Sequence, residues 1–140
     1  MGRVLFIVLL LSFKVNSQEL SGSWKVISYE DEIAYFNKIT DSISYKDSSR
    51  KDQAENFRQM SELIIFPITY NFDNNGGFVM NHPMMGKISG QFEVDKSNKK
   101  IIMIDEKGKK DALPFIYTDG ILFVEMKMET GYIKLGLKKS

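Results

Sequence analysis

Few residues in this sequence could support catalysis or metal binding. His82 is the only histidine and there is no cysteine, so a triad-type nucleophilic mechanism would have to run through His82. That histidine precedes Pro83, and the chain carries no nucleophile signature. Zinc and iron sites normally draw on several His or Cys ligands, and the carboxylates show no EF-hand spacing. We therefore expect a protein that is not an enzyme and that holds no metal and no cofactor.

Methionine-rich strands are the second feature with chemical meaning. Seven methionines follow Met1; Met80, Met103, Met126 and Met128 fall in expected strands, and Met84 and Met85 lie next to one. Methionine adapts to varied apolar shapes, so a methionine-rich and aromatic interior would suit a hydrophobic ligand of loose specificity. The alternative is a narrow interior that the same side chains fill completely. The sequence leaves both readings open.

The elements that must position these residues are mostly strands. From Ile68 onward, short alternating or apolar runs are separated by turn residues about every ten positions. Gly86 and Gly90 lie on the apolar face of one run, which indicates strong curvature. The expected strands are 23–29, 68–72, 78–81, 86–94, 101–104, 113–117, 121–128 and 133–137. Because closure removes exposed edges, we predict an all-β fold, an eight-stranded antiparallel up-and-down barrel, with a two-sheet sandwich as the alternative.

The connection between the first strand and Ile68 is too long for a hairpin loop and should have structure of its own. Ser49 followed by Asp52 resembles a capping box, and Pro67 would end the helix that follows. The apolar face of this helix would hold Ala54, Phe57, Met60, Ser61 and Ile64. We therefore predict a helical insertion between the first and second strands, with a lid segment at about 48–66. Upstream, 30–37 reads as a short helix and 39–45 as a weak strand, without a decision between them.

The amino terminus has the features of an export signal. Arg3 precedes an unbroken apolar run at 4–11, which is shorter than the roughly 20 residues that span a membrane. A small residue at Ser17 predicts cleavage between Ser17 and Gln18. We therefore expect a signal peptide at 1–17 and a mature domain at 18–140, exported to a secreted or periplasmic location and free of the membrane after cleavage. With no cysteine, stability must come from a packed core.

Charge excludes one class of partner. Removing 17 of the 140 residues leaves 123, with 17 basic and 18 acidic residues interspersed along the chain. A domain that binds nucleic acid usually concentrates positive charge on one face. We therefore expect no nucleic-acid partner. The lysines at 99–100 and 107–110 fall at expected turns, where charged residues are usually only solvated.

The start of the mature chain resembles a known group. Gly22-Ser23-Trp24 matches the Gly-x-Trp signature of the lipocalin-like proteins of the calycin superfamily, and the strand order over 19–139 is similar. The resemblance implies that Trp24 closes one barrel end and that a late basic residue, Lys134 or Lys138, packs over it. Thr118-Asp119-Gly120 matches only two positions of the lipocalin Thr-Asp-Tyr motif. The helical insertion is similar to the lid of the fatty-acid-binding branch, but that branch has ten strands.

The function that these features favour is binding of a small hydrophobic ligand, such as a lipid or fatty acid, inside the barrel. The alternative is a filled barrel that acts as a protein–protein interaction module. Oligomeric state is not predicted. Gly22 and Trp24 are the structural signature, and the expected cavity or lid residues are Phe57, Met60, Ile64, Tyr70, Phe72, Met80, Phe92, Met103, Val124 and Met126.

Overall fold

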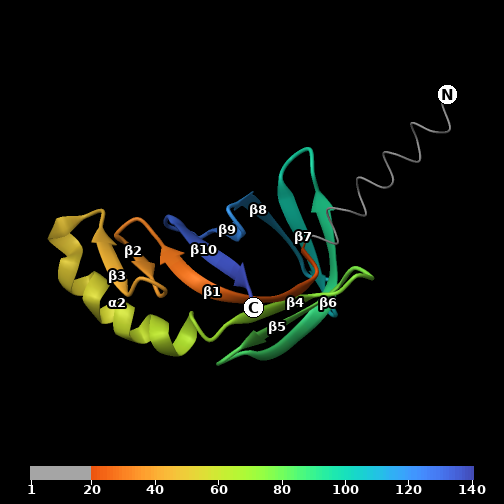
Figure 1. Ribbon diagram of the computed structural model, residues 1–140, viewed down its shortest axis with the longest axis horizontal. Helices are drawn as coiled ribbons and strands as arrows, with labels where there is room; N and C mark the ends of the chain where they lie inside the picture. Colours follow the sequence, from red (N-terminus) through yellow and green to blue (C-terminus); the bar gives the residue numbers. More distant parts are fainter. Residues whose placement is uncertain (1–19) are drawn as a thin grey trace.

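The computed structural model describes residues 20–140, and the predicted signal peptide and its cleavage site lie outside this range. Residues 20–140 form ten strands and one α-helix (Figure 1). No helix of the described part is long and apolar enough to span a membrane. The elements in chain order are β1 (Gly22–Glu30), β2 (Ala34–Asn37), β3 (Ser42–Tyr45), the 3-10 turn η1 (Ser48–Arg50), α2 (Lys51–Ile64), β4 (Thr69–Phe72), β5 (Gly77–His82), β6 (Gly86–Asp95), β7 (Lys100–Asp105), β8 (Lys110–Thr118), β9 (Ile121–Lys127) and β10 (Tyr132–Lys139).

Eight of the strands form a closed antiparallel barrel. β4 to β10 pair in sequence order, and β1 closes the ring because it pairs with β4 on one side and with β10 on the other. The predicted all-β, eight-stranded up-and-down barrel is therefore confirmed, and the sandwich alternative is not. Tight hairpin turns supply the reversals; at the β8–β9 turn, Asp119 and Gly120 both have positive φ angles, of 54° and 78°.

The two additional strands branch from β1. Trp24 and Lys25 of β1 pair with β4, whereas Tyr29 and Glu30 pair with β2. Between these halves the register against β10 shifts, from Val26 opposite Leu137 to Ser28 opposite Gly136. A bulge of this kind bends a strand and re-aims its edge. Consequently the second half of β1 leaves β4 and carries the β2–β3 hairpin outside the ring.

The helix lies between β3 and β4, so the predicted position directly after the first strand is corrected, although the helix still falls between two neighbouring strands of the ring, β1 and β4. The short helix considered for 30–37 is wrong, because Ala34–Asn37 is a strand. Asp31 explains this: its carboxylate accepts the N–H groups of Ile33 and Ala34 and so forms a turn. The weak strand considered for 39–45 is confirmed in part as β3.

Capping also differs from the expectation. Asp47, not Ser49, begins the helical segment; its carboxylate accepts the Ser49 N–H at 3.0 Å before the 3-10 turn. Arg50, which precedes α2, makes no side-chain capping bond. The expected Ser49–Asp52 capping box is therefore wrong, because a preceding Asp already satisfies the first free N–H group.

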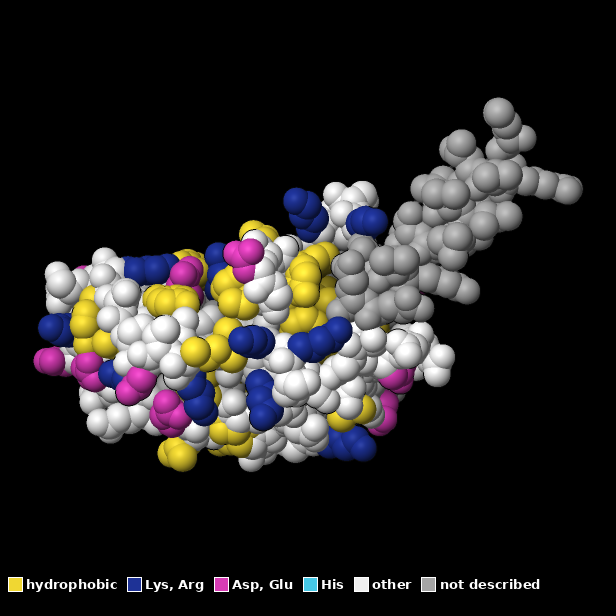
Figure 2. All heavy atoms as spheres, viewed as in Figure 1, with side chains coloured by type: hydrophobic (Ala, Val, Ile, Leu, Met, Phe, Trp, Pro, Cys, Tyr) yellow, Lys and Arg dark blue, Asp and Glu magenta, His cyan; other side chains and the backbone are white. Residues whose placement is uncertain are grey.

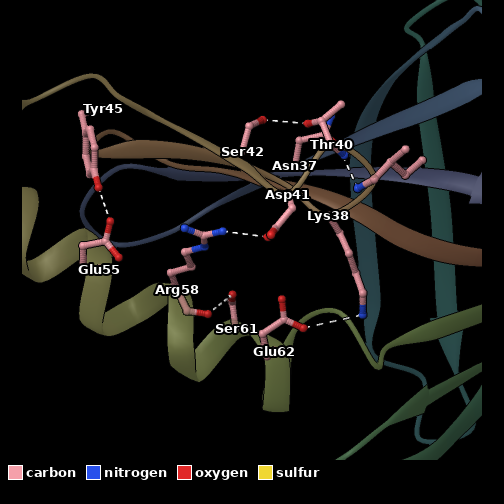
Figure 3. Close-up of polar contacts among 11 residues, drawn as sticks. Asn37, Lys38, Thr40, Asp41, Ser42, Tyr45, Glu55, Arg58, Ser61 and Glu62 are labelled. Atoms are coloured by element: carbon pink, nitrogen blue, oxygen red, sulfur yellow. Dashed lines mark hydrogen bonds and ion pairs between the residues drawn. The ribbon is translucent and has the colours of Figure 1, made fainter.

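Polar contacts attach α2 to the β2–β3 hairpin (Figure 3). Arg58 pairs with Asp41 at 2.8 Å, and Lys38 pairs with Glu62 at 3.7 Å. The Tyr45 hydroxyl donates to Glu55. Figure 1 places α2, β2 and β3 together at one end of the molecule, with β6 at the other. We call the unit formed by β2, β3 and α2 (34–64) the arm.

Gly90 allows two strands of the barrel to come close together. A Cβ atom at this position would lie 2.0 Å from the Ile104 carbonyl oxygen and 2.8 Å from the Asp105 Cα. Those atoms are backbone of the neighbouring strand β7 and cannot move aside easily. Glycine at 90 is therefore required by the close approach of β7, whereas Gly86 has open space around it and a φ of 76°.

Candidate functional site

A cavity of about 600 Å³ lies in the barrel, so the barrel is not completely filled. Its apolar lining is rich in methionine, with five methionines from β5, β7, β9 and the segments beside them. This volume is in the range of small-molecule sites. The lining residues are Tyr70, Phe78, Met80, Met85, Ile88, Lys100, Met103, Asp105, Lys109, Asp111, Ala112, Leu113, Pro114, Glu125, Met126, Lys127 and Met128.

The cavity opens through the wall between β8 and β9. These strands pair only from Phe115 opposite Val124 to Thr118 opposite Ile121. Consecutive residues of both strands, 111–114 of β8 and 125–127 of β9, line the cavity. Side chains of consecutive strand residues point to opposite faces, so both faces line one space only where that space passes between the strands. We call this gap the side opening.

Pro114 explains why the ladder stops. The Phe115 N–H donates to Lys99 O on the β7 side, at 3.0 Å. Backbone groups alternate along a strand, so position 114 directs its amide toward β9, where Glu125 would be the next partner. Proline has no N–H and cannot donate to Glu125. The side opening therefore begins at Pro114.

Tyr70 supplies a polar group to the cavity. Its side chain is buried, with 6% of the residue exposed, and no hydrogen bond to its hydroxyl is present within residues 20–140. Burial raises the pKa of Tyr70 to about 12, so the phenol is neutral at physiological pH. The ring of Tyr70 stacks on Phe72, with centroids 6.2 Å apart, which holds it in place.

Charged residues surround the side opening. Lys100, Lys109 and Lys127 are exposed and line the cavity together with three carboxylates, including Asp111. The Asp105 carboxylate accepts two N–H groups of the β7–β8 turn, from Lys107 and Lys109, so it also shapes this rim. The sequence analysis missed these lysines as site residues. Lys100 and Lys109 fall in expected turns and Lys127 falls in an expected strand, and neither position indicates that a cavity opens beside it. On the face shown in Figure 2, basic and acidic side chains are interspersed.

The structure divides the predicted ligand residues into three groups. Tyr70, Met80, Met103 and Met126 line the barrel cavity. Phe72, Phe92 and Val124 are buried in the core without lining it, and the rings of Phe72 and Phe92 are 4.8 Å apart. Phe57, Met60 and Ile64 belong to α2, and no residue of α2 lines the barrel cavity.

A second, smaller pocket of about 300 Å³ lies between α2 and the strands β1 and β2. Phe57 and Met60 line it, and the Phe57 ring packs against Tyr29, with centroids 5.0 Å apart. The Tyr29 hydroxyl donates to Asp31 at 3.0 Å, and burial together with that carboxylate raises the pKa of Tyr29. The Tyr29 hydroxyl therefore already has a hydrogen-bond partner within the protein.

Trp24 of β1 is completely buried. Its indole N–H donates to Leu20 O at 2.8 Å, and Tyr117 meets its ring edge-on at 6.2 Å. The late basic residue over the ring is Lys139, with Nζ 5.4 Å from the ring centroid. The expectation of Lys134 or Lys138 is wrong: Lys139 pairs directly opposite Trp24 and shares its face, while Lys134 contacts Glu30.

His82 has a structural role. Its Nδ1 accepts the N–H groups of Met84 and Met85, both at 3.1 Å, and so holds the β5–β6 turn. Both bonds require an Nδ1 without a proton. The role that the structure gives to His82, which the sequence analysis considered for catalysis, is therefore to stabilise this turn.

Together these features define a class: a small closed β-barrel with an apolar, laterally open cavity. The chain is similar to the crystal structure of a DUF4847 family protein from Bacteroides vulgatus, with a TM-score of 0.55 and 14% sequence identity. The similarity covers 90% of this chain and 97% of that chain and shows the fold. No family model matches the chain, and no curated protein matches it.

Proposed function

We propose that this protein is a lipocalin-like carrier that binds a small apolar molecule in the barrel cavity. The observation that carries the proposal is the cavity of about 600 Å³, lined by five methionines and by Tyr70 and Phe78. Flexible thioether side chains can adapt to ligands of different shape. The interior walls of the cavity make mainly apolar contacts, which favour binding of a ligand over catalysis.

Trp24 supports the lipocalin-like part of the proposal. A buried tryptophan in the first strand, covered by a late lysine, is the arrangement that the Gly-x-Trp resemblance implies. Only the identity of that lysine differs from the expectation. Export of the mature domain 18–140 belongs to the same proposal, and mass spectrometry of the protein recovered outside the producing cell would test it through its amino-terminal residue.

We assign ligand access to the side opening and not to α2. Met85 and Met128 line the cavity and are 62% and 53% exposed, so an apolar ligand meets apolar side chains before it reaches the interior. The helix α2 of the arm packs against β1 and β2, where it lines the second, smaller pocket. The lid role expected for Phe57, Met60 and Ile64 is therefore not part of this proposal.

Displacement of a fluorescent probe tests the proposal. The mature protein is titrated with N-phenyl-1-naphthylamine, and long-chain alcohols, esters and fatty acids then compete for the site. Met126→Trp places extra volume in the cavity and should weaken probe binding at least about tenfold, since overfilling a cavity excludes its ligand. Leu63→Trp is the matched control, because Leu63 is 71% exposed on α2 and lines neither pocket.

Absence of probe binding to the wild-type protein, or equal binding by the Met126→Trp and Leu63→Trp variants, would contradict a cavity site. Circular dichroism of both variants establishes that they are folded.

Protein binding is the second candidate function, and exposed apolar side chains on α2 favour it. Leu63 and Met60 are 71% and 52% exposed. A double variant, Met60→Lys with Leu63→Lys, would abolish binding of a purified partner while leaving probe binding in the barrel unchanged. If the double variant keeps both partner binding and probe binding, protein binding through α2 is excluded.

A further inference from the structure

We propose that Tyr70 is the specificity-determining residue of the barrel cavity and selects apolar ligands that carry a neutral hydrogen-bond acceptor, such as an ester or ketone carbonyl or an alcohol. The inference rests on the proposed function and names the ligand class of the same site. Tyr70 brings the only side-chain hydroxyl in the cavity lining of the described chain.

The Tyr70 residue is 6% exposed, and its hydroxyl, which has no hydrogen-bond partner in residues 20–140, is open to the cavity. Other tyrosine hydroxyls in residues 20–140 do have side-chain partners. The Tyr29 hydroxyl donates to Asp31, and the Tyr132 hydroxyl donates to Glu30. Tyr70 instead faces Met80 across the β4–β5 ladder and reaches the cavity. No buried side-chain nitrogen or oxygen atom of the described residues lacks a partner, so this hydroxyl is open to water in the cavity, and a ligand atom can take the place of that water.

The protonation state allows the hydroxyl to donate. The phenol is neutral at physiological pH, and burial raises its pKa further, so its O–H is available to an acceptor on the ligand. In the absence of such an acceptor, an apolar ligand would displace water from the hydroxyl and leave it unsatisfied, which lowers affinity.

The acceptor is neutral because no cation accompanies Tyr70 inside. The three lysines of the lining, Lys100, Lys109 and Lys127, are all exposed at the side opening. A carboxylate beside Tyr70 would be buried without a counter-ion, which is costly. A charged ligand group therefore belongs at the lysines, and the interior takes the neutral acceptor.

Competition with matched ligands tests the inference. Methyl decanoate, undecane and decanoate displace N-phenyl-1-naphthylamine from wild-type protein and from Tyr70→Phe. We expect the wild type to prefer methyl decanoate over undecane by about tenfold, a typical effect of one satisfied hydrogen bond. Tyr70→Phe should remove this preference while the probe and undecane bind as before.

A preference that persists in Tyr70→Phe would overturn the inference, as would a Tyr70→Phe variant that weakens decanoate in place of the ester. Failure of the wild type to bind the probe would instead overturn the proposed function. If Tyr70→Phe does not fold, 13Cζ-tyrosine NMR of the wild type decides: the Tyr70 resonance should shift with methyl decanoate and not with undecane, and equal shifts would overturn the inference.

Discussion

The Lys139 ammonium lies over the Trp24 ring, 5.4 Å from its centroid, and joins the last strand of the barrel to the first. Lys139→Met retains much of the apolar stem and removes the charge. We expect a loss of about 0.5–2 kcal/mol in the free energy of unfolding, the usual range for a cation–π contact. Trp24 is the only tryptophan, so its fluorescence in a urea titration reports on this end of the barrel directly. Lys138→Met, one position away on the other face, should have little effect.

Gly90→Ala should be strongly destabilising. The added Cβ would meet backbone atoms of β7 at 2.0 and 2.8 Å, so two strands must move apart. Overpacking of this kind typically costs about 1–3 kcal/mol, and backbone contacts place this variant at the upper end. Thermal unfolding measures the effect, with Gln91→Ala, an exposed neighbour on β6, as control. Equal melting temperatures of the two variants would show that β6 and β7 do not approach so closely.

Pro114→Ala should narrow the side opening. Alanine restores the N–H that faces Glu125, and the β8–β9 ladder can then extend by one pair. We expect slower association and dissociation of the fluorescent probe in stopped-flow measurements, with a smaller change in the equilibrium constant. Hydrogen exchange should show a new protected amide at position 114. Ala112→Val, on the same strand, adds no N–H; an equal change in rates would argue against the ladder as the cause.

Phe57→Ala should weaken the arm. The Phe57 ring packs on Tyr29 and, at 6.4 Å, on Phe36. Removal of a large, partly buried aromatic side chain should lower the free energy of unfolding by about 2–4 kcal/mol. Leu63→Ala, on the exposed face of the same helix, should be close to neutral. Probe binding by folded Phe57→Ala protein should be unchanged, since α2 contributes nothing to the barrel cavity; a loss of binding would restore the lid role of the helix.

Asp95 should contribute to the acid sensitivity of the β6–β7 turn. Hydrogen bonds from the Asn98 side chain and backbone N–H lower the pKa of Asp95. A carboxyl group with a lowered folded-state pKa stabilises the fold above its unfolded pKa, about 3.9, and this contribution is lost as pH falls through the folded value. Asn98→Ala should therefore flatten the decline in melting temperature below about pH 4. An identical decline in wild type and Asn98→Ala would contradict the assignment.

Strand positions were predictable from sequence where the signal is local. Alternation in 68–72 and 133–137, with glycine-containing turns between the runs, gave β4 to β10 and the closed barrel. The β2 strand was missed because its four residues are too few to establish a period, and the turn made by Asp31 depends on backbone N–H groups whose direction the sequence does not reveal.

Features that depend on register were not predictable. The sequence analysis expected Lys134 or Lys138 over Trp24, and Lys138 misses Lys139 by one residue, which reverses the face of a strand. The register of β10 against β1 contains a bulge near Ile27, which no local pattern indicates. In the same way, the predicted apolar face of α2 is correct at Ala54 and Ser61, which are buried. The sequence does not indicate which surface of the protein that face covers. Met60 consequently lies 52% exposed instead of over the cavity.

Closure of the ring has a consequence for folding order. Ser140 donates to Ser23 O, a bond between residues 117 positions apart, and one edge of β1, from Trp24 to Glu30, pairs with β10. Contacts of such sequence separation form late, because the intervening chain must first be organised. A growing chain therefore cannot complete the barrel until its final strand is available. We propose that this protein crosses a membrane before it folds, and late closure of the barrel would keep the polypeptide unfolded and competent for translocation.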